Sequence, residues 1–225
     1  MAKATIKSVR QSELSKAAFA VLVEKGIRNT TVEQVAARAG VSKSVVLHHY
    51  GDKNALFQAV MRRVNTVLRD GVVELLKNAN TPMERLAAII VGNFSYPIFE
   101  QKVCHAWLNL CGDVPYNTDS QRIQTVIASR MRSNLVPELR KLPLKFELES
   151  VASQIRISID GIWLQASLQT EPLSSREGID ATLEATIRLA GFDDKVAQEL
   201  FAAARTMETV AGIVLKSKAF NEKLS

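Results

Sequence analysis

Residues 30–53, TTVEQVAARAGVSKSVVLHHYGDK, limit the possible folds more than any other segment of the chain. Apolar residues recur at helical spacing on both sides of Gly40, which predicts two short helices. Glycine tolerates the left-handed backbone needed to leave the first helix, and Ser42 can cap the second. A helix, a glycine-containing turn and a capped helix are typical of a helix-turn-helix, whose second helix enters the major groove of DNA.

The rest of the chain has helical periodicity as well, without a convincing run of strand-like alternation. Ser/Thr-x-x-Glu/Gln patterns mark helix starts, at Thr31–Gln34 or Thr30–Glu33 and at two further places, Thr81–Glu84 and Ser174–Glu177. Gly26 and Gly191 mark helix ends, and Pro137 should bend or end its helix. We expect nine or ten helices, over about residues 8–25, 32–39, 43–50, 53–78, 82–100, 102–112, 119–137, 146–169, 176–190 and 193–216.

The basic residues are concentrated in the N-terminal part of the chain. Residues 1–70 contain 12 Lys and Arg against five Asp and Glu, whereas the net charge of the whole chain is +6. The excess therefore belongs entirely to the segment with the predicted helix-turn-helix. Such a module gains affinity for DNA by releasing counterions from phosphates. A merely solubilising surface is the alternative, but it does not require this asymmetry.

The composition also limits the class of protein. Apolar residues make up 47% of the chain and charged residues 23%, which is ordinary for a globular protein. No apolar run reaches the ~18 residues that a membrane span needs, and the N-terminus lacks the apolar core of a signal peptide. We therefore expect a cytoplasmic protein without membrane contact. Cys104 and Cys111 lie roughly 10 Å apart on one predicted helix, too far for a disulfide, and we interpret them as buried apolar side chains.

Catalytic motifs are missing from the sequence. The three histidines, His48, His49 and His105, do not have the spacing of a helical metal-binding pair, and adjacent side chains on a helix point about 100° apart. Neither a glycine-rich phosphate loop nor a Gly-x-Ser-x-Gly elbow occurs. We expect no enzyme activity, no metal site and no cofactor.

Residues 10–60 resemble the N-terminal domain of the TetR/AcrR family of transcriptional regulators. The turn glycine, capping serine, lysine, aromatic pair and Asp-Lys cap of TTVEQVAARAGVSKSVVLHHYGDKNALFQAV stand at matching offsets. Further segments, HHYGDKN, AWLNL, RMRSNLVPELRK and IDGIWL, resemble the choline-responsive repressors of the glycine betaine pathway within that family. The resemblance implies an all-α protein with a three-helix DNA-binding domain, residues 1–55, and a ligand-binding and dimerisation domain, residues 56–225.

Helical phase assigns the DNA contacts within this module. The side of the second helix opposite Val46 and Tyr50 should face base edges, and neighbouring polar groups should bind phosphates. Lys53 combines its charge with the free N–H groups at a helix start, which suits a phosphate. The predicted DNA-binding residues are Thr31, Ser42, Lys43, Ser44, Val45, Leu47, His48, His49 and Lys53. An N-terminal arm with Lys3, Lys7 and Arg10 would add contacts, although a frayed terminus is an equal alternative.

The partners expected from the resemblance are double-stranded DNA, a second copy of the chain and a small-molecule effector. One helix-turn-helix provides too little specificity for a genome, so a homodimer on a pseudo-palindromic operator is expected. The family places its interface in the last helices, here about 146–169 and 176–190. The alternative is that the apolar faces of these helices only close the monomer core.

Aromatic residues suggest the nature of the effector. Trp and Tyr rings attract quaternary ammonium through their quadrupoles, and an acid supplies the counter-charge, for which Glu100 is an alternative to Asp113. The predicted ligand-binding residues are Tyr96, Trp107, Asp113, Tyr116 and Trp163. Trp107 and Trp163 stand inside segments that carry the narrower resemblance. A regulator of efflux or catabolic genes with an unrelated ligand, and a helical scaffold that does not bind DNA, are the alternatives.

Overall fold

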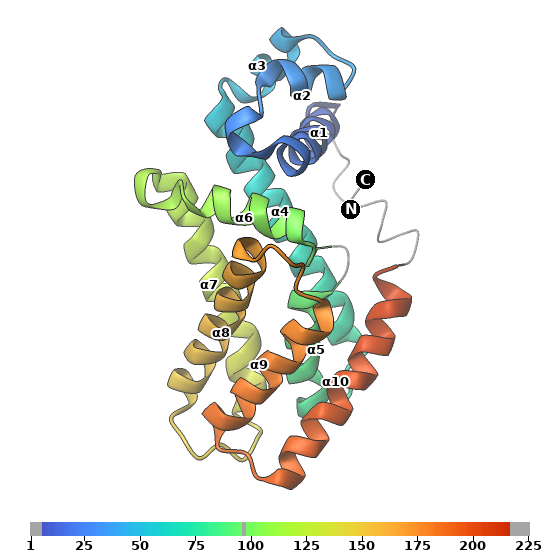
Figure 1. The fold of residues 1–225 in the computed structure, drawn as a ribbon, viewed down its shortest axis with the longest axis vertical. Helices are drawn as coiled ribbons and strands as arrows, with labels where there is room; N and C mark the ends of the chain where they lie inside the picture. The colour runs from blue at the N-terminus through green and yellow to red at the C-terminus, as the bar shows by residue number, and fades with distance from the viewer. Residues whose placement is uncertain (1–5, 96–97, 217–225) are drawn as a thin grey trace.

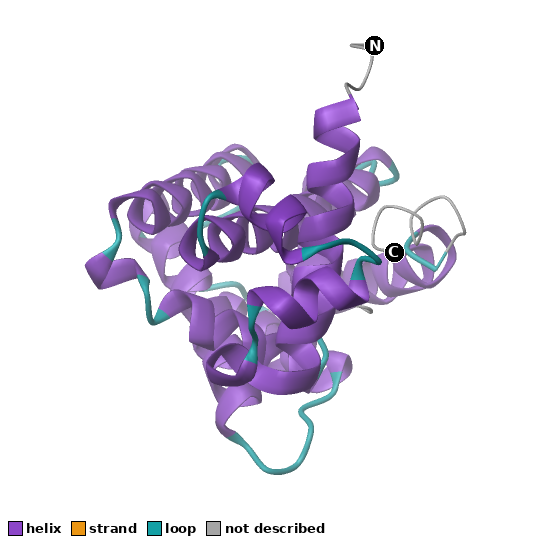
Figure 2. Cartoon of the chain, turned by 90° about the horizontal axis from the view of Figure 1, so that it is seen from above, coloured by secondary structure: helices purple, strands orange, loops and turns teal. Residues whose placement is uncertain are grey.

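The computed structural model describes residues 6–95 and 98–216, and every element in these two ranges is helical (Figures 1 and 2). The all-α prediction is confirmed. One short 3₁₀-helix, η1, was not predicted. No helix in the described ranges is long and apolar enough to span a membrane. The elements are α1 (Ile6–Asn29), α2 (Val32–Arg38), α3 (Lys43–Tyr50), α4 (Lys53–Lys77), α5 (Pro82–Phe94), α6 (Gln101–Cys111), η1 (Val114–Tyr116), α7 (Thr118–Leu139), α8 (Leu148–Leu168), α9 (Ser175–Ala190) and α10 (Asp194–Val214).

The helices form a small upper part and a larger lower bundle, joined by α4 (Figure 1). The upper part contains α1, α2, α3 and the start of α4. In the lower bundle α5 is central, and α4, α7, α9 and α10 all pack against it. The helix α6 lies between the two parts, where it contacts both α1 and α8. An element that touches both parts offers a mechanical route between them.

Each part has its own apolar core. The upper core takes buried residues from α1 to α4, and also Ala106 and Leu110 of α6. The lower core is built from α4 to α10. The predicted domain boundary at residue 55 lies within the continuous helix α4, and that helix contributes to both cores. The upper part is therefore packed onto the lower bundle and is not joined to it by a flexible linker.

Helix ends follow local sequence signals, apart from α7, which continues past Pro137 to Leu139, and one larger exception. Thr31, Thr81 and Ser174 all form the predicted capping boxes. The exception is α5, which ends at Phe94 and not near residue 100. A proline at position 97 is incompatible with an uninterrupted helix through this segment, and the prediction overlooked this signal.

Two glycines allow α5 to approach its neighbours closely. A Cβ atom added at Gly92 of α5 would lie 2.7 Å from Cγ2 of Val72 on α4. A Cβ atom added at Gly178 of α9 would lie 2.8 Å from Cδ1 of Phe94. Any larger residue would push these helices apart, since interiors are close-packed. These contacts fix the position of Phe94, which reaches the aromatic cluster described below.

The two cysteines behave as apolar side chains. Cys104 is buried and Cys111 is half-buried, and neither takes part in a disulfide. Burial raises the pKa of both thiols to about 12. A thiol with so high a pKa is almost entirely protonated near neutral pH and is a poor nucleophile. This agrees with their interpretation as small apolar residues.

Candidate DNA-binding surface and effector site

The helix α3 is held by a framework of short local contacts. Thr31 caps α2, and Gly40 adopts a φ of 65° in the turn that follows. The backbone N–H of Val41 donates to the carbonyl of Ala36 at 3.0 Å and closes this turn. The Tyr50 hydroxyl donates to the Gln11 carbonyl at 2.6 Å and ties the end of α3 to α1. The geometry is that of a helix-turn-helix.

The N-terminal half of α3 faces solvent. Ser42, Lys43 and Ser44 are exposed and Val45 is half-buried. Ser42 occupies the N-cap position, but its side chain makes no capping hydrogen bond, so the predicted cap is wrong in this respect. Its hydroxyl instead lies 2.7 Å from that of Ser44. A pair of hydroxyls on an exposed helix start can exchange this contact for a phosphate or a base edge.

Lys43 is the cation at the tip of this surface. Its Nζ lies 2.6 Å from Oε1 of Glu33 on α2, and more than half of each side chain is exposed. The hydrogen bond from Lys43 lowers the pKa of Glu33. Water screens an exposed pair of this kind, so the bond is easily replaced by an external anion. Lys43 is therefore positioned by Glu33 without being locked in place.

Leu47 and His49 were predicted at the DNA surface, but the structure turns both toward the protein. Leu47 packs against the upper core next to Val46. His49 is half-buried, its carbonyl accepts a hydrogen bond from Gln11, and its Nδ1 atom has no partner among the described residues. His48 is exposed as expected, with its ring edge-on to that of His49. The face of α3 that packs against the protein is therefore wider than the sequence argument assumed from Val46 and Tyr50 alone.

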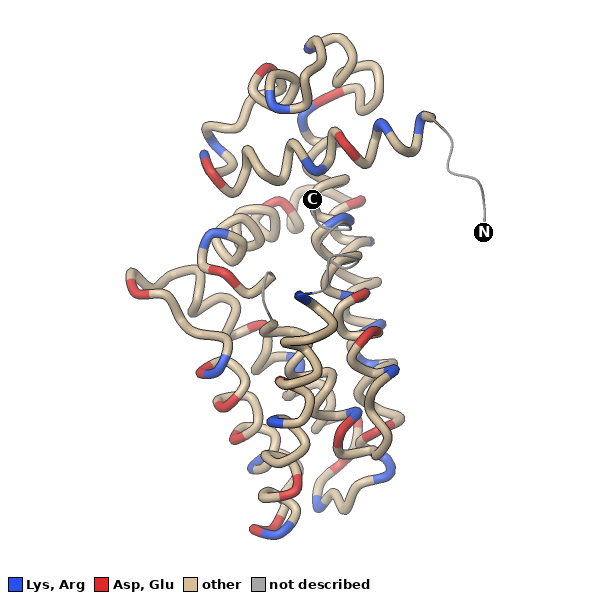
Figure 3. Tube along the Cα trace, turned by 90° about the vertical axis from the view of Figure 1, so that its right-hand side faces the viewer, with Lys and Arg blue, Asp and Glu red and all other residues tan. Residues whose placement is uncertain are grey.

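Thr31 and Lys53 lie before and after α3 along the chain. The hydroxyl and backbone N–H of Thr31 are both used in its capping box with Gln34. Lys53 begins α4, with its Nζ 3.4 Å from the Ile27 carbonyl and 5.1 Å from the centre of the Phe57 ring. Basic positions recur over this whole part of the molecule (Figure 3). An exposed lysine, Lys43, thus stands at the start of α3, and a half-buried one, Lys53, follows its end.

The two tryptophans come together in the lower bundle. Trp163 on α8 is 4% exposed, and its Nε1 donates to the Asn93 carbonyl at 3.1 Å. Trp107 on α6 is half-buried, with its ring centre 5.6 Å from that of Trp163. Phe99 lies edge-on at 5.6 Å from Trp163, and Phe94 is 5.0 Å from Phe99. These four rings, called the aromatic cluster below, join α5, the following loop, α6 and α8.

Asp113, Tyr116 and the alternative acid Glu100 do not join this cluster. Tyr96 lies outside the described residues. Asp113 precedes η1, and its carboxylate accepts a hydrogen bond from Ser120 Oγ at 2.9 Å. Tyr116, in η1, is 88% exposed. Glu100 is exposed at the N-cap position of α6. Of the predicted cage, the structure brings together Trp107 and Trp163.

Phe94 and Phe99 were missed by the sequence argument. In one continuous helix, residues five apart point about 140° away from each other, which separates the two rings. Ending α5 at Phe94 frees the chain to turn, and Phe99 then packs edge-on against Phe94 and Trp163. The proline at position 97 was the signal from which this turn could have been predicted.

An apolar stripe remains uncovered on the outer face of α8. Ile157 is 56% exposed, Leu164 41% and Leu168 67%. A Cβ atom added at Gly161, between them, would meet nothing within 4 Å. The spacing of these residues follows one face of a helix. An exposed apolar stripe is typical of surfaces that bind another protein.

Together the fold and these surfaces define a helix-turn-helix transcriptional regulator with a separate helical effector domain. Residues 14–60 match the model of bacterial regulatory proteins of the tetR family, and residues 82–191 match that of the BetI-type transcriptional repressor C-terminal domain. The chain belongs to the TetR family, whose members here are regulators and not enzymes. The resemblance seen over residues 10–60 is thus confirmed.

Several known proteins are similar along most of the chain. The regulator BetI of Escherichia coli O157:H7 is 33% identical over 175 residues, covering 77% of this chain and 90% of that protein. A transcriptional regulator from Pseudomonas aeruginosa PAO1 is 28% identical, with a TM-score of 0.63, covering 88% of this chain and 93% of that one. A regulator from Saccharomonospora viridis, crystallised with choline, is 17% identical with a TM-score of 0.71 and covers 80% and 96%. The last likeness shows the fold alone.

Proposed function

We propose that two copies of the chain bind a pseudo-palindromic DNA operator through their α3 helices and leave it when a small quaternary ammonium compound binds. The observation that carries the DNA-binding part is the exposed basic end of α3 on a buried three-helix framework. Bound to its operator, the protein acts as a repressor by excluding other proteins from the site. The proposal separates into contacts with DNA, dimerisation and effector binding.

The DNA contacts divide into base readout and phosphate binding. Lys43, Ser44 and Val45 enter the major groove first, where lysine donates to guanine and valine packs on a thymine methyl. Ser42, His48, Lys53 and the backbone near Thr31 bind phosphates on either side. Leu47 and His49 fix the angle of α3 from within the protein, because Leu47 packs on the upper core and Nδ1 of His49 is buried. Specificity then depends mainly on the first turn of α3.

The dimer forms through the apolar stripe of α8 together with α9. Two such stripes facing each other across a two-fold axis build a four-helix bundle, and a stripe of this kind is self-complementary. Gly161 at its centre allows the two α8 helices to approach closely. The dimer sets the distance between the two α3 helices and hence the half-site spacing.

The effector binds at the aromatic cluster. Tryptophan faces attract quaternary ammonium, and the cluster lies within the segment that matches the BetI-type model. Trp107 is carried by α6, which also packs against α1 of the DNA-binding part. A ligand inserted between Trp107 and Trp163 displaces α6 and shifts the population toward α3 spacings that no longer fit the operator.

The first experiment measures binding to fragments of the chain's own upstream DNA by mobility shift at several salt concentrations. The double variant Lys43→Ala plus Lys53→Ala should lose at least about tenfold in affinity, and the slope of log K against log salt should fall by about two. Arg122→Ala, which removes an exposed cation of α7, is the matched control. Wild-type binding by the double variant would show that α3 is not the reader.

The second experiment tests the dimer by sedimentation velocity. Leu164→Glu places a charge on the α8 stripe and should convert dimers to monomers, because an unpaired charge is costly to bury. Ile213→Glu, at a 69% exposed position of α10, is the control and should leave the dimer intact. Monomers in the wild type, or dimers in both variants, would contradict the proposed interface.

The third experiment tests the effector by tryptophan fluorescence and thermal shift with choline. At 100 times its Kd, choline should stabilise the protein by ~2.7 kcal/mol. The neutral isostere of choline, 3,3-dimethylbutanol, should bind the wild type at least about tenfold more weakly than choline does. Choline should also bind the Trp107→Leu variant at least about tenfold more weakly than it binds the wild type. An equal response to choline and the isostere would overturn the cation site and favour a regulator of efflux or catabolic genes with another ligand.

A further inference from the structure

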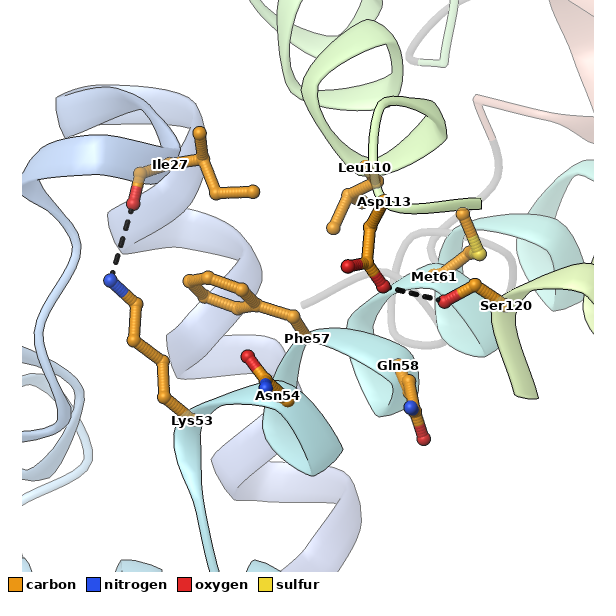
Figure 4. Close-up of a pocket in the computed structure, with 9 residues that line it drawn as sticks. All are labelled: Ile27, Lys53, Asn54, Phe57, Gln58, Met61, Leu110, Asp113 and Ser120. Atoms are coloured by element: carbon orange, nitrogen blue, oxygen red, sulfur yellow. Dashed lines mark hydrogen bonds between the residues drawn. The ribbon is translucent and has the colours of Figure 1, made fainter. Parts of the chain in front are cut away.

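A cavity of about 220 Å³ lies where the DNA-binding part meets the lower bundle, apart from the aromatic cluster (Figure 4). One wall comes from the end of α1 and the start of α4, and the facing wall comes from the end of α6, from Asp113 just before η1 and from the start of α7. Its volume is below the ~300 Å³ at which drug-sized pockets begin, so it suits a small metabolite. It is lined by Ile27, Lys53, Asn54, Phe57, Gln58, Met61, Leu110, Asp113 and Ser120.

Opposite charges stand on the two walls. Lys53 and Asp113 lie on either side of the Phe57 ring, one in the DNA-binding part and the other beside η1 (Figure 4). Among the described residues, the Lys53 ammonium makes one long hydrogen bond, at 3.4 Å to the Ile27 carbonyl. The Asp113 carboxylate accepts one, from Ser120 at 2.9 Å. An ammonium has three donors and a carboxylate about four lone-pair sites, so both groups retain capacity for a ligand.

The surface between the two charges is apolar. Phe57 and Met61 of α4 form one side, and Leu110 of α6 and Ile27 of α1 complete it. An alkyl chain placed there removes apolar surface from water at both walls. Asn54 also lines the cavity and can hydrogen-bond to a polar end group, whereas the Gln58 amide donates to Oδ1 of Asn117 at 3.1 Å. The lining therefore complements a molecule that has an anionic group at one end, an alkyl chain in the middle and a cationic group at the other end.

We propose that this cavity is a second effector site, which binds a short zwitterion of the aminoalkanoate class. The ligand carboxylate pairs with Lys53, its ammonium pairs with Asp113, and its methylene groups cover Phe57, Met61 and Leu110. The inference goes beyond the proposed function, because it assigns a different ligand class to a site outside the aromatic cluster. Bridging the two walls also neutralises Lys53, a proposed phosphate contact, so occupancy weakens DNA binding and DNA weakens ligand binding by the same factor.

The test is isothermal titration calorimetry on the full chain without DNA, so that its outcome does not depend on operator binding. The ligands are aminoalkanoates from β-alanine to 6-aminohexanoate, with butylamine and butyrate as single-charge controls. One zwitterion of the series should bind saturably, at least about tenfold more tightly than either control, since each control loses one ion pair. Absence of saturable binding across the series overturns the proposal.

Variants assign the two ends of the ligand. Asp113→Asn should reduce zwitterion affinity to that of butyrate, and Lys53→Met to that of butylamine. Asp119→Asn, an exposed acid of α7 paired with Arg122, is the matched control and should bind as the wild type does. Asp113→Ser provides a second removal of the charge, and far-ultraviolet circular dichroism checks the fold of each variant. Unchanged affinity in folded Asp113→Asn and Asp113→Ser overturns the site.

A final arm separates this site from the aromatic cluster. Zwitterion affinity should be the same in Trp107→Leu as in the wild type. Choline affinity, by contrast, should fall only in variants of the aromatic cluster such as Trp107→Leu. Loss of zwitterion binding in Trp107→Leu would place the ligand in the cluster and overturn the second site. Failure of choline to bind would affect the proposed function and leave the calorimetric result on the cavity unchanged.

Discussion

The helices α3 and α5 are built for opposite purposes. In α5, nine of 13 residues are buried, and neighbouring helices surround it. In α3, Val46 is the one residue of eight classed as buried. The helix at the centre of the lower core therefore has almost no free surface, whereas α3, the helix proposed to read DNA, contributes a single buried side chain to the upper core. Stability and recognition are assigned to different helices.

Their ion pairs show the same contrast. Arg85 of α5 donates to Glu138 at 2.7 Å, and the Glu138 side chain, 5% exposed, also binds Lys141 at 2.8 Å. Lys43 of α3 pairs with Glu33, and both are largely exposed. The Glu138 carboxylate is buried although its cations reach solvent, so it cannot lose a partner cheaply, while an exposed pair exchanges its partner for water or phosphate. The pair in α5 is structural and the pair in α3 is replaceable.

The largest effect is expected from Arg85→Ala. The substitution leaves a buried Glu138 carboxylate with Lys141 as its remaining ion-pair partner, and breaking a buried pair typically costs 3–5 kcal/mol, so we expect a loss of about 3 kcal/mol. Lys43→Ala removes the exposed pair and should leave the urea midpoint unchanged. Both are measured by urea denaturation followed by circular dichroism. Equal midpoints for the two variants would remove the contrast between α5 and α3.

Acid should weaken the same buried pair. Burial raises the pKa of Glu138, but hydrogen bonds from Lys141 and Arg85 outweigh it and hold the pKa below its ordinary value. A carboxyl with a lowered folded pKa stabilises the protein above its unfolded pKa of about 4.3 and loses this contribution as pH falls through the folded value. The free energy of unfolding should therefore decrease below about pH 4. Glu138→Gln should flatten this decrease, and an unchanged slope would contradict the assignment.

A smaller loss is expected from Val46→Ala in α3. Two buried methyl groups are removed at ~0.8 kcal/mol each, and the cavity brings the expected cost to about 2 kcal/mol. Because Val46 is the main anchor of α3, DNA binding should weaken along with stability. Val126→Ala, at a 66% exposed position of α7, should change the free energy of unfolding by less than about 0.5 kcal/mol. If both variants unfold alike, α3 is anchored elsewhere.

Features set by neighbouring residues were predictable from the sequence. Thr31 caps α2, Gly40 and Gly191 adopt a positive φ, and the start of α5 follows from Thr81 and Pro82. Each of these depends on contacts within a few residues along the chain. The helix-turn-helix is a chain of such local signals, which is why its bounds were predicted within a residue or so.

Features that depend on distant residues were not predictable in this way. Asp113 and Tyr116 have suitable chemistry for a cation cage, but Asp113 binds Ser120 and Tyr116 is exposed on η1. Leu47 is half-buried because α1 and α4 pack on more than one side of α3. Phe99 joins the aromatic cluster through a turn after α5. Periodicity gives the face of a helix but not which neighbours cover it.

The smallest expected effect concerns the two caps of the helix-turn-helix. The Thr31 hydroxyl accepts a hydrogen bond from the Gln34 N–H, whereas the Ser42 side chain makes no capping bond. Thr31→Ala should therefore cost about 1 kcal/mol of stability, and Ser42→Ala only a few tenths. If Ser42 instead meets a phosphate, its removal weakens DNA binding without changing the urea midpoint. Comparable losses of stability would show that Ser42 caps α3 after all, and that the first turn of the reading helix is more rigid than its exposed contacts indicate.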